Sequence, residues 1–155
     1  MLQSNYPGVR LTIYGNGSEK PALKKLASDL EFKNFEIVAD QDFRNVVSGY
    51  DVFVCTSVYE GYPNALIEAQ IANLPAVSYD IDYGPNEIIR NRISGVLVQE
   101  KAPGALADGL KELLSNYEFF RANMSEHATH LKNKHSARNS LTPLTSVYLS
   151  APQED

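Results

Sequence analysis

The sequence predicts an α/β fold in which helices cover both faces of a doubly wound parallel sheet. Short apolar runs alternate along the chain with longer segments that have helical spacing or length. The runs are apolar at successive positions, which is the pattern of a strand that is buried on both faces. We therefore expect one domain with a single sheet over residues 1–132.

Strands and helices are expected in alternation. The strands are placed in the β-branched and aromatic runs at residues 9–14, 35–38, 51–55, 75–79 and 95–98. The helices are placed at residues 19–29, 43–48, 64–73, 86–90, 103–115 and 118–132. The segment 103–115 carries one apolar stripe at i, i+4, i+7 and i+8, as expected for a helix that packs on a sheet. Its members are Leu106, Leu110, Leu113 and Leu114.

The two ends of the chain differ from its middle. The first strand arrives with no strand–helix unit before it, so the sequence looks cut from a longer one at its N-terminal edge. Residues 133–155 are polar, contain Pro143 and Pro152, and show little periodicity. We expect these residues to form a loosely ordered tail.

Composition limits the classes of function. The chain has 155 residues, 43% of them hydrophobic, and a net charge of −5. Nucleic-acid binding draws most of its affinity from basic side chains that neutralise phosphates, so the acidic balance argues against a nucleic-acid partner. Cys55 has no second cysteine to pair with, which favours a reducing compartment. With no export signal and no apolar stretch of about 20 residues, we expect a cytoplasmic protein.

The most informative segment, residues 56–70, follows the strand that ends at Cys55. It predicts a loop and a helix start at the carboxyl end of a strand, where ligands bind in open α/β sheets. Gly61 permits close approach of the backbone to a ligand, and Pro63 suits a first helical turn. The amides of residues 64–66 would then point outward at the positive end of the helix dipole. We expect a diphosphate to bind there.

Glu60 and Glu68 lie on either side of this helix start. Glu60 could accept hydrogen bonds from sugar hydroxyls or stabilise positive charge at an anomeric carbon, and Glu68 could hold a ribose diol. Their separation suits a ligand that runs sugar, phosphates, ribose. The alternative is structural, because a glutamate before a helix favours the dipole and one within a helix is often only solvated. Residue chemistry by itself leaves both interpretations open.

Residues 60–68, Glu-Gly-Tyr-Pro-Asn-Ala-Leu-Ile-Glu, resemble the Glu-x7-Glu motif of the retaining, GT-B-fold glycosyltransferases of family 4. The similarity continues through the following helix, strand and loop to the strand at residues 94–98. Upstream, residues 13–17 resemble the family's strand and glycine turn, and the likeness spans about residues 9–116. Several elements in the family's order are far more specific than a Glu-x7-Glu motif by itself.

The resemblance implies that residues 1–132 are the Rossmann-like, nucleotide-sugar-binding half of a GT-B fold, as in bacterial glycosyltransferase group 1 proteins. It implies transfer of a hexose from a nucleotide sugar, expected to be a UDP-sugar, with retention at the anomeric carbon and without a metal or other cofactor. Glu60 would be the catalytic residue that faces the donor sugar, and Glu68 would bind the ribose. The other implied donor-binding residues are Gly15, Gly17, Gly61, Tyr62, Pro63, Asn64, Ala65 and Leu66.

The resemblance also implies partners outside this chain. An N-terminal domain would bind the acceptor, a glycan or a cell-wall polymer. The family's Arg and Lys that neutralise the diphosphate precede the first strand, and this sequence begins after that segment. We therefore expect incomplete charge neutralisation and no activity from the fragment alone. By analogy, the parent enzyme is expected at the inner face of the cell membrane.

Two other functions are compatible with the same fold. A non-catalytic nucleotide-sugar-binding or interaction module needs no acceptor domain. A sugar-nucleotide epimerase needs acid and base groups that we cannot identify in this sequence. A dehydrogenase is disfavoured because Gly15-Asn16-Gly17 lacks the third glycine of a dinucleotide fingerprint.

The remaining polar and aromatic clusters have simpler interpretations than chemistry. His127, His130 and His135 are spaced irregularly with no cysteine nearby, so we expect solvated helix positions rather than a metal site. Asp80 and Asp82 are expected in turn or hydrogen-bonding roles. Two tyrosines of the same loop, Tyr79 and Tyr83, are expected to line or cover the cleft.

Overall fold

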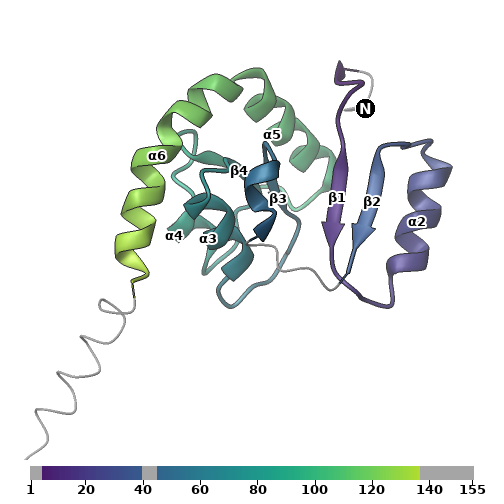
Figure 1. The fold of residues 1–155 in the computed structure, drawn as a ribbon, viewed down its shortest axis with the longest axis horizontal. Helices are drawn as coiled ribbons and strands as arrows, with labels where there is room; N and C mark the ends of the chain where they lie inside the picture. The colour runs from purple at the N-terminus through teal and green to yellow at the C-terminus, as the bar shows by residue number, and fades with distance from the viewer. Residues whose placement is uncertain (1–4, 40–44, 137–155) are drawn as a thin grey trace, which may run out of the picture. The chain divides into compact units, whose positions relative to one another are not determined.

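The computed structural model describes residues 5–39 and 45–136, and the chain divides after Gly49 into two compact units. The first unit contains β1 (Leu11–Tyr14), α2 (Lys20–Asp29), β2 (Phe35–Val38) and the 3-10 helix η2 (Val47–Gly49). β1 and β2 pair in parallel, and parallel strands need a crossover connection, which α2 supplies (Figure 1).

The second unit is a three-stranded parallel sheet with its helices. The strands are β3 (Phe53–Cys55), β4 (Ala76–Tyr79) and β5 (Gly95–Val98), hydrogen-bonded in that order. The helices are α3 (Asn64–Ile71), α4 (Pro85–Ile88), α5 (Pro103–Ser115) and α6 (Tyr117–Lys134). Because all three strands run in one direction, the loops that follow β3 and β4 leave from the same edge of the sheet.

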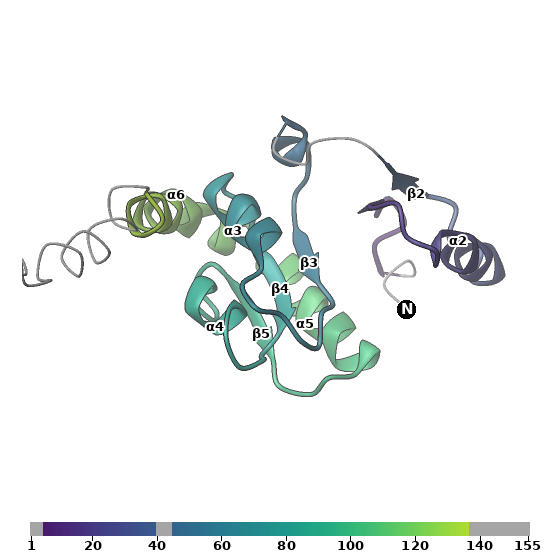
Figure 2. The same cartoon turned by 90° about the horizontal axis from the view of Figure 1, so that it is seen from below.

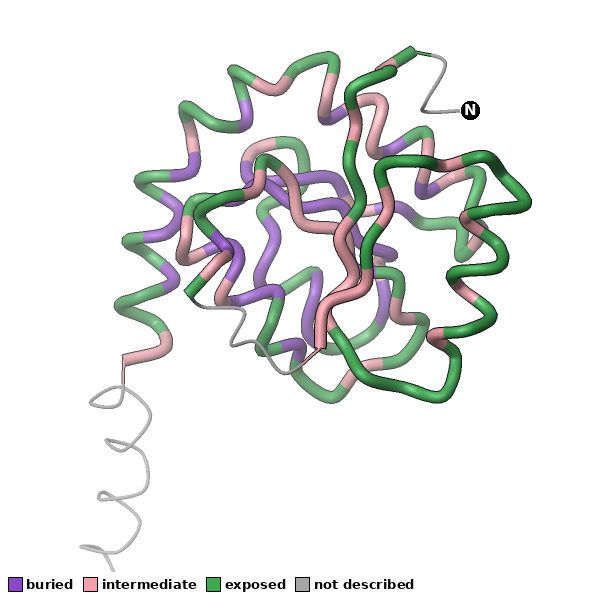
Figure 3. The backbone as a smooth tube through the Cα atoms, turned by 45° about the vertical axis from the view of Figure 1, so that its right-hand side comes forward, coloured by how far each residue is buried: buried purple, intermediate pink, exposed green. Residues whose placement is uncertain are grey.

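Helices cover both faces of this sheet, because successive side chains of a strand point to opposite sides. On one face Val77 and Tyr79 of β4 belong to a buried cluster with Leu113 of α5. On the other face Ala76 of β4 belongs to a second cluster with Leu66 of α3. Figure 2 shows α3 and α5 on opposite sides of the strands, and Figure 3 shows that the backbone positions of the strands and helices of this unit include many buried ones.

α6 belongs to both clusters. Phe120, near its start, packs in the cluster of α5, and Leu131, near its end, packs in the cluster of α3. Met124 and Ala128 between them are buried as well. The last turns of α6 are therefore held beside α3, where the two helices pack together.

The predicted α/β class with parallel strands is confirmed, and the strands at residues 35–38 and 95–98 have the predicted bounds. The expected single sheet is wrong for the described residues, because no strand of the first unit pairs with a strand of the second. The predicted helix at residues 43–48 begins outside the described residues, and its described end is the 3-10 helix η2. From residue 137 on, the predicted tail also lies outside them. The extent of a domain at residues 1–132 stays a prediction. Within residues 5–39 and 45–136, no helix has the length and apolar character needed to cross a membrane.

His127 is buried, so the prediction of a solvated histidine is wrong at this position. Its side chain is 1% exposed, and Nε2 donates a hydrogen bond to the carbonyl oxygen of Ile88 at 2.9 Å. The helix explains the difference, because His127 lies three residues after Met124 and four before Leu131, on the face that packs inward. His130, one turn further along at the edge of this face, is exposed.

His127 makes the stability of the second unit sensitive to acid. Burial lowers the pKa of His127, against the opposing effect of the hydrogen bond to Ile88, and Arg90 lowers it further. The unfolded chain, where the histidine pKa is about 6.5, therefore takes up a proton at a higher pH than the folded chain does. The free energy of unfolding should fall as the pH drops from above about 6.5 toward the folded-state pKa.

Replacement of His127 by glutamine tests the predicted pH dependence of stability. The glutamine side-chain amide can still donate a hydrogen bond to the carbonyl oxygen of Ile88, but it does not titrate. Urea unfolding of both chains between about pH 5 and pH 8 should show a shallower pH dependence for His127→Gln. The same slope in both chains would assign the acid sensitivity to other groups.

Candidate functional site

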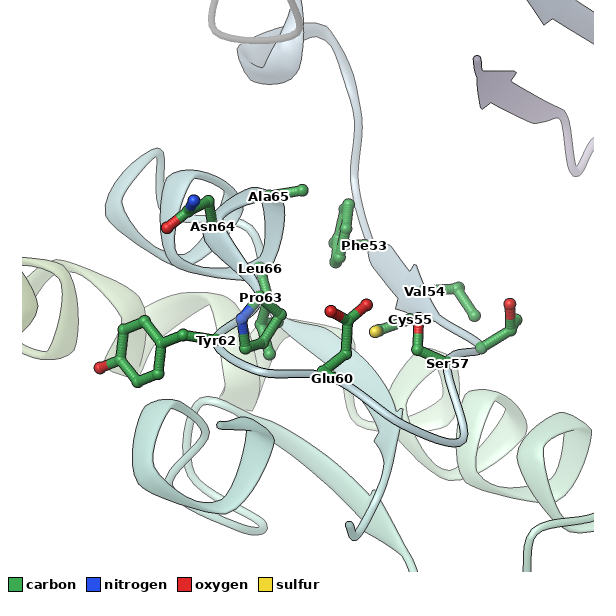
Figure 4. Close-up of a pocket in the computed structure, with 11 residues that line it drawn as sticks. Phe53, Val54, Cys55, Ser57, Glu60, Tyr62, Pro63, Asn64, Ala65 and Leu66 are labelled. Carbon is green, nitrogen blue, oxygen red and sulfur yellow. The ribbon is translucent and has the colours of Figure 1, made fainter. Parts of the chain in front are cut away.

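A pocket of about 470 Å³ lies between β3 and the start of α3 (Figure 4). β3 forms one side, the loop after β3 continues it, and the first turn of α3 closes it. The predicted site residues that line it are Glu60, Tyr62, Pro63, Asn64, Ala65 and Leu66. The pocket therefore lies at the carboxyl end of a strand, as expected for a ligand site in an open α/β sheet.

The start of α3 offers free backbone donors to this pocket. Pro63 is the N-cap residue, and no described side chain caps the helix. The carbonyl oxygen of Pro63 accepts hydrogen bonds from the amides of Leu66 and Ile67, at 3.0 and 3.2 Å. In the described part of the chain, the amides of Asn64 and Ala65 have no acceptor. Two free donors at the positive end of a helix dipole suit an anionic group such as a phosphate.

Glu60 is half-buried, and its carboxylate points into the pocket toward Cys55 and Ser57 (Figure 4). No residue that the structure describes forms a hydrogen bond or an ion pair with this carboxylate. A carboxylate without a protein partner can accept hydrogen bonds from a ligand or stabilise a neighbouring positive charge. The geometry is therefore compatible with the predicted role of Glu60.

Glu68 does not line the pocket, but it lies on the helix face that continues from it. It follows Asn64 by four residues and Ala65 by three, and helix residues at these spacings are neighbours. Its side chain is half-buried, again with no partner among residues 5–39 and 45–136. Along the chain, Glu60 thus precedes the free amides of Asn64 and Ala65, and Glu68 follows them.

Gly84 supports Pro63 from the loop after β4. Its φ is +107°, in the region that favours glycine, and a Cβ at this position would lie 2.5 Å from Cδ of Pro63. Gly61, by contrast, is exposed, and a Cβ there would meet nothing within 4 Å. The space around Gly61 is open to a ligand, although its part in binding stays a prediction.

Replacement of Gly84 by alanine should therefore lower stability by about 1–3 kcal/mol, through backbone strain and displacement of Pro63. Gly61→Ala is the matched control, since the added methyl group has room. Thermal unfolding of the three chains should show a lower melting temperature for Gly84→Ala only. Equal melting temperatures for the two variants would contradict the packing of Gly84 on Pro63.

Gly15 and Gly17 belong to the first unit, where they follow β1 and are exposed. The amide of Gly15 donates to the carbonyl oxygen of Val38 at 2.9 Å, which extends the β1–β2 pairing by one residue. A Cβ at either glycine would meet nothing within 4 Å. Their predicted part in donor binding stays a prediction.

Several residues of the site or its surroundings differ from their predicted places. Tyr79 is 5% exposed and packs in the core, so the prediction that it lines the cleft is wrong, since its place in β4 points it inward. Tyr83 is 75% exposed. Thr56, Ser57 and the side chains of β3 line the pocket, although sequence reasoning named none of them as site residues. The rule that ligands bind at strand ends could have identified Thr56 and Ser57.

Asp80 accepts a hydrogen bond from Gln99, in keeping with the predicted hydrogen-bonding role. Across the part of the chain that the structure describes, no three His, Cys, Asp or Glu side chains are grouped so that they could hold a metal ion.

The family model described as glycosyl transferases group 1 matches residues 1–131. The chain is 33% identical over 110 residues to the poly(ribitol-phosphate) alpha-N-acetylglucosaminyltransferase of Staphylococcus aureus (strain COL), covering 70% of this chain and 22% of that protein. It is 28% identical over 98 residues to the GtfA subunit of the UDP-N-acetylglucosamine–peptide N-acetylglucosaminyltransferase of Streptococcus agalactiae, covering 63% of this chain and 19% of that protein. The chain therefore spans about a fifth of the length of these relatives.

Solved structures share the fold. A mutant of S. aureus TarM in complex with fondaparinux, alpha-GlcNAc-glycerol and UDP has a TM-score of 0.86 at 26% identity, over 96% of this chain and 31% of that one. Pneumococcal O-GlcNAc transferase GtfA, in complex with UDP and GlcNAc, has a TM-score of 0.81 at 21% identity, over 94% of this chain and 31% of that one. The predicted Rossmann-like α/β class, as found within GT-B glycosyltransferases, is thereby confirmed.

Proposed function

The chain belongs to the group 1 glycosyl transferases, and we propose that it is the C-terminal, donor-binding part of a retaining family 4 enzyme. The donor is a UDP-sugar, and the acceptor is a glycan or a cell-wall polymer. The sequence resemblance implies a hexose donor, and the names of two relatives favour N-acetylglucosamine, in which an acetamido group replaces the 2-hydroxyl of glucose.

The observation that carries this proposal is the arrangement at the start of α3. Glu60 precedes the free amides of Asn64 and Ala65 along the chain and Glu68 follows them, and none of these groups has a described protein partner. The amides suit a diphosphate, and a carboxylate suits the hydroxyls of a sugar or a ribose. A nucleoside diphosphate sugar presents these groups in this order.

The same arrangement of groups could stabilise the transition state for transfer of the sugar. The bond between the anomeric carbon and the diphosphate oxygen breaks, an acceptor hydroxyl oxygen bonds to the same carbon, and the proton of that hydroxyl passes to the leaving diphosphate. Negative charge therefore grows on the diphosphate and positive charge on the sugar ring during the step. The amides of Asn64 and Ala65 would stabilise the leaving diphosphate, and Glu60 would stabilise the ring. No metal or other cofactor has a part in this proposal.

The described lining of the pocket leaves part of the ligand charge without a partner. None of its lining residues is Lys or Arg, whereas a diphosphate carries several negative charges. The chain spans about a fifth of the length of its relatives. We therefore place the basic side chains that neutralise the rest of the diphosphate charge, and the acceptor-binding domain, in a longer protein. A cytoplasmic location, with that protein at the inner membrane face, belongs to the same proposal.

Calorimetric titration of the chain with UDP, UDP-N-acetylglucosamine, UDP-glucose, GDP and ADP tests the proposal. We expect saturable binding of the uridine nucleotides, weaker binding of GDP and ADP, and a preference between the two UDP-sugars that identifies the donor. A folded chain that binds none of them at millimolar concentration would contradict the proposal. Binding without transfer in the longer protein would favour a non-catalytic nucleotide-sugar-binding module.

A further inference from the structure

Tyr62 has a different environment from the other pocket residues. Its phenol ring points away from the pocket, whereas the carboxylate of Glu60 points into it (Figure 4). The phenol oxygen of Tyr62 lies 3.2 Å from Nε2 of His135, and the two ring centroids are 5.6 Å apart. Tyr62 therefore connects the loop of the pocket to a residue 73 positions further along the chain.

The position of His135 is fixed by the end of α6. This residue is the C-cap residue of α6, and its amide donates to the carbonyl oxygen of Leu131 at 2.9 Å. Leu131 is 1% exposed and packs in the cluster that also contains Leu66 of α3. The core thus fixes the end of α6, and His135 at this end contacts the phenol group of Tyr62.

The charge states of the two rings favour a neutral hydrogen bond. Burial lowers the pKa of the His135 imidazole, and Lys134 lowers it further. Burial also raises the pKa of the Tyr62 phenol, and Glu87 raises it further. At neutral pH a protonated phenol can therefore donate to an unprotonated imidazole nitrogen.

The loop before Tyr62 has few other side-chain contacts with the core among the described residues. Val58 and Tyr59 are 58% and 88% exposed, so neither side chain anchors the loop to the core. The attachment comes after Glu60, through the Tyr62 ring and the packing of Pro63 on Gly84. The position of Glu60 therefore depends on the residues that follow it.

We propose that His135 is a positioning residue of the donor site, which holds the loop of residues 60–63 in place through Tyr62. His135 does not contact the ligand, and it acts by reducing the number of positions that Glu60 and Gly61 can adopt. The proposal rests on the function proposed above only for the identity of the ligand. Loss of one such contact should weaken binding of a UDP-sugar about three- to tenfold.

The test compares His135→Ala, Tyr62→Phe and their double variant with the unmodified chain. Hydrogen exchange of residues 56–66, measured by mass spectrometry without ligand, should become faster in both single variants. The double variant should be little worse than either single one, because both remove the same contact. His130→Ala on the exposed side of α6 is the control, and His135→Gln, which keeps a hydrogen-bonding group, should restore part of the protection.

The affinity for UDP-N-acetylglucosamine is then measured by calorimetry on the same chains. Faster exchange together with weaker binding supports the proposal. Unchanged exchange of residues 56–66 in His135→Ala overturns it, and so does faster exchange with unchanged affinity. If the unmodified chain binds no UDP-sugar, the proposed function fails, while the exchange data still decide whether His135 holds the loop.

Discussion

A chain with Gly95→Ala is expected to lose about 3 kcal/mol of stability. This loss is a large part of the net free energy of unfolding of a domain of this size. Gly95 begins β5 and lies opposite Ala76 of β4. A Cβ at this position would overlap the carbonyl oxygen of Ala76, which is backbone and cannot rotate away. The two strands would have to separate, and urea unfolding should show a much lower midpoint.

Gly104→Ala is the matched control for this prediction. Gly104 lies in the first turn of α5, and a Cβ there would meet nothing within 4 Å. Alanine favours a helix over glycine by up to about 1 kcal/mol, so this variant should be as stable as the unmodified chain or slightly more stable. Equal losses in the two variants would show that β4 and β5 are not paired as described.

A chain with Glu68→Ala is expected to bind UDP about 10- to 100-fold more weakly, with a melting temperature close to that of the unmodified chain. The proposed ribose contact is a charged hydrogen bond, and such bonds contribute more than neutral ones. The carboxylate has no described partner in the protein, so its removal should affect the ligand and leave the fold intact. Calorimetry with UDP measures the loss.

Glu118→Ala controls for the change in net charge. Glu118 is exposed in the first turn of α6 and lies outside the pocket lining, so this variant should bind UDP as the unmodified chain does. Equal affinity in Glu68→Ala and Glu118→Ala would remove Glu68 from the ribose site.

Much of the second unit could be predicted from the sequence, because its pattern is local. The helix at residues 103–115 and the strand at residues 95–98 were placed with the bounds that the structure shows. The apolar stripe of the helix agrees with its one buried face, and the successive apolar residues of the strand agree with burial on both of its faces. The position of the pocket followed from the strand that ends at Cys55 and the helix that starts after Pro63.

The residues whose predicted environments are wrong depend on tertiary contacts, which leave no local pattern in the sequence. His127 is polar and belongs to a largely polar helix, and only the carbonyl oxygen of Ile88, 39 residues earlier, explains its burial. The sequence places Tyr79 at the cleft together with Tyr83 of the same loop, but the alternation of side chains along β4 turns Tyr79 toward α5. The contact between Tyr62 and His135 joins residues 73 positions apart, which no spacing rule could reveal.

The central claim is that the free amides at the start of α3 bind the diphosphate of a nucleotide sugar. Titration of UDP into the isotope-labelled chain, followed by amide NMR, tests it most directly. We expect the largest saturable shifts at the amides of Asn64 and Ala65, with smaller shifts at Glu60 and Glu68. Saturable binding that leaves the Asn64 and Ala65 amides unshifted would contradict the account.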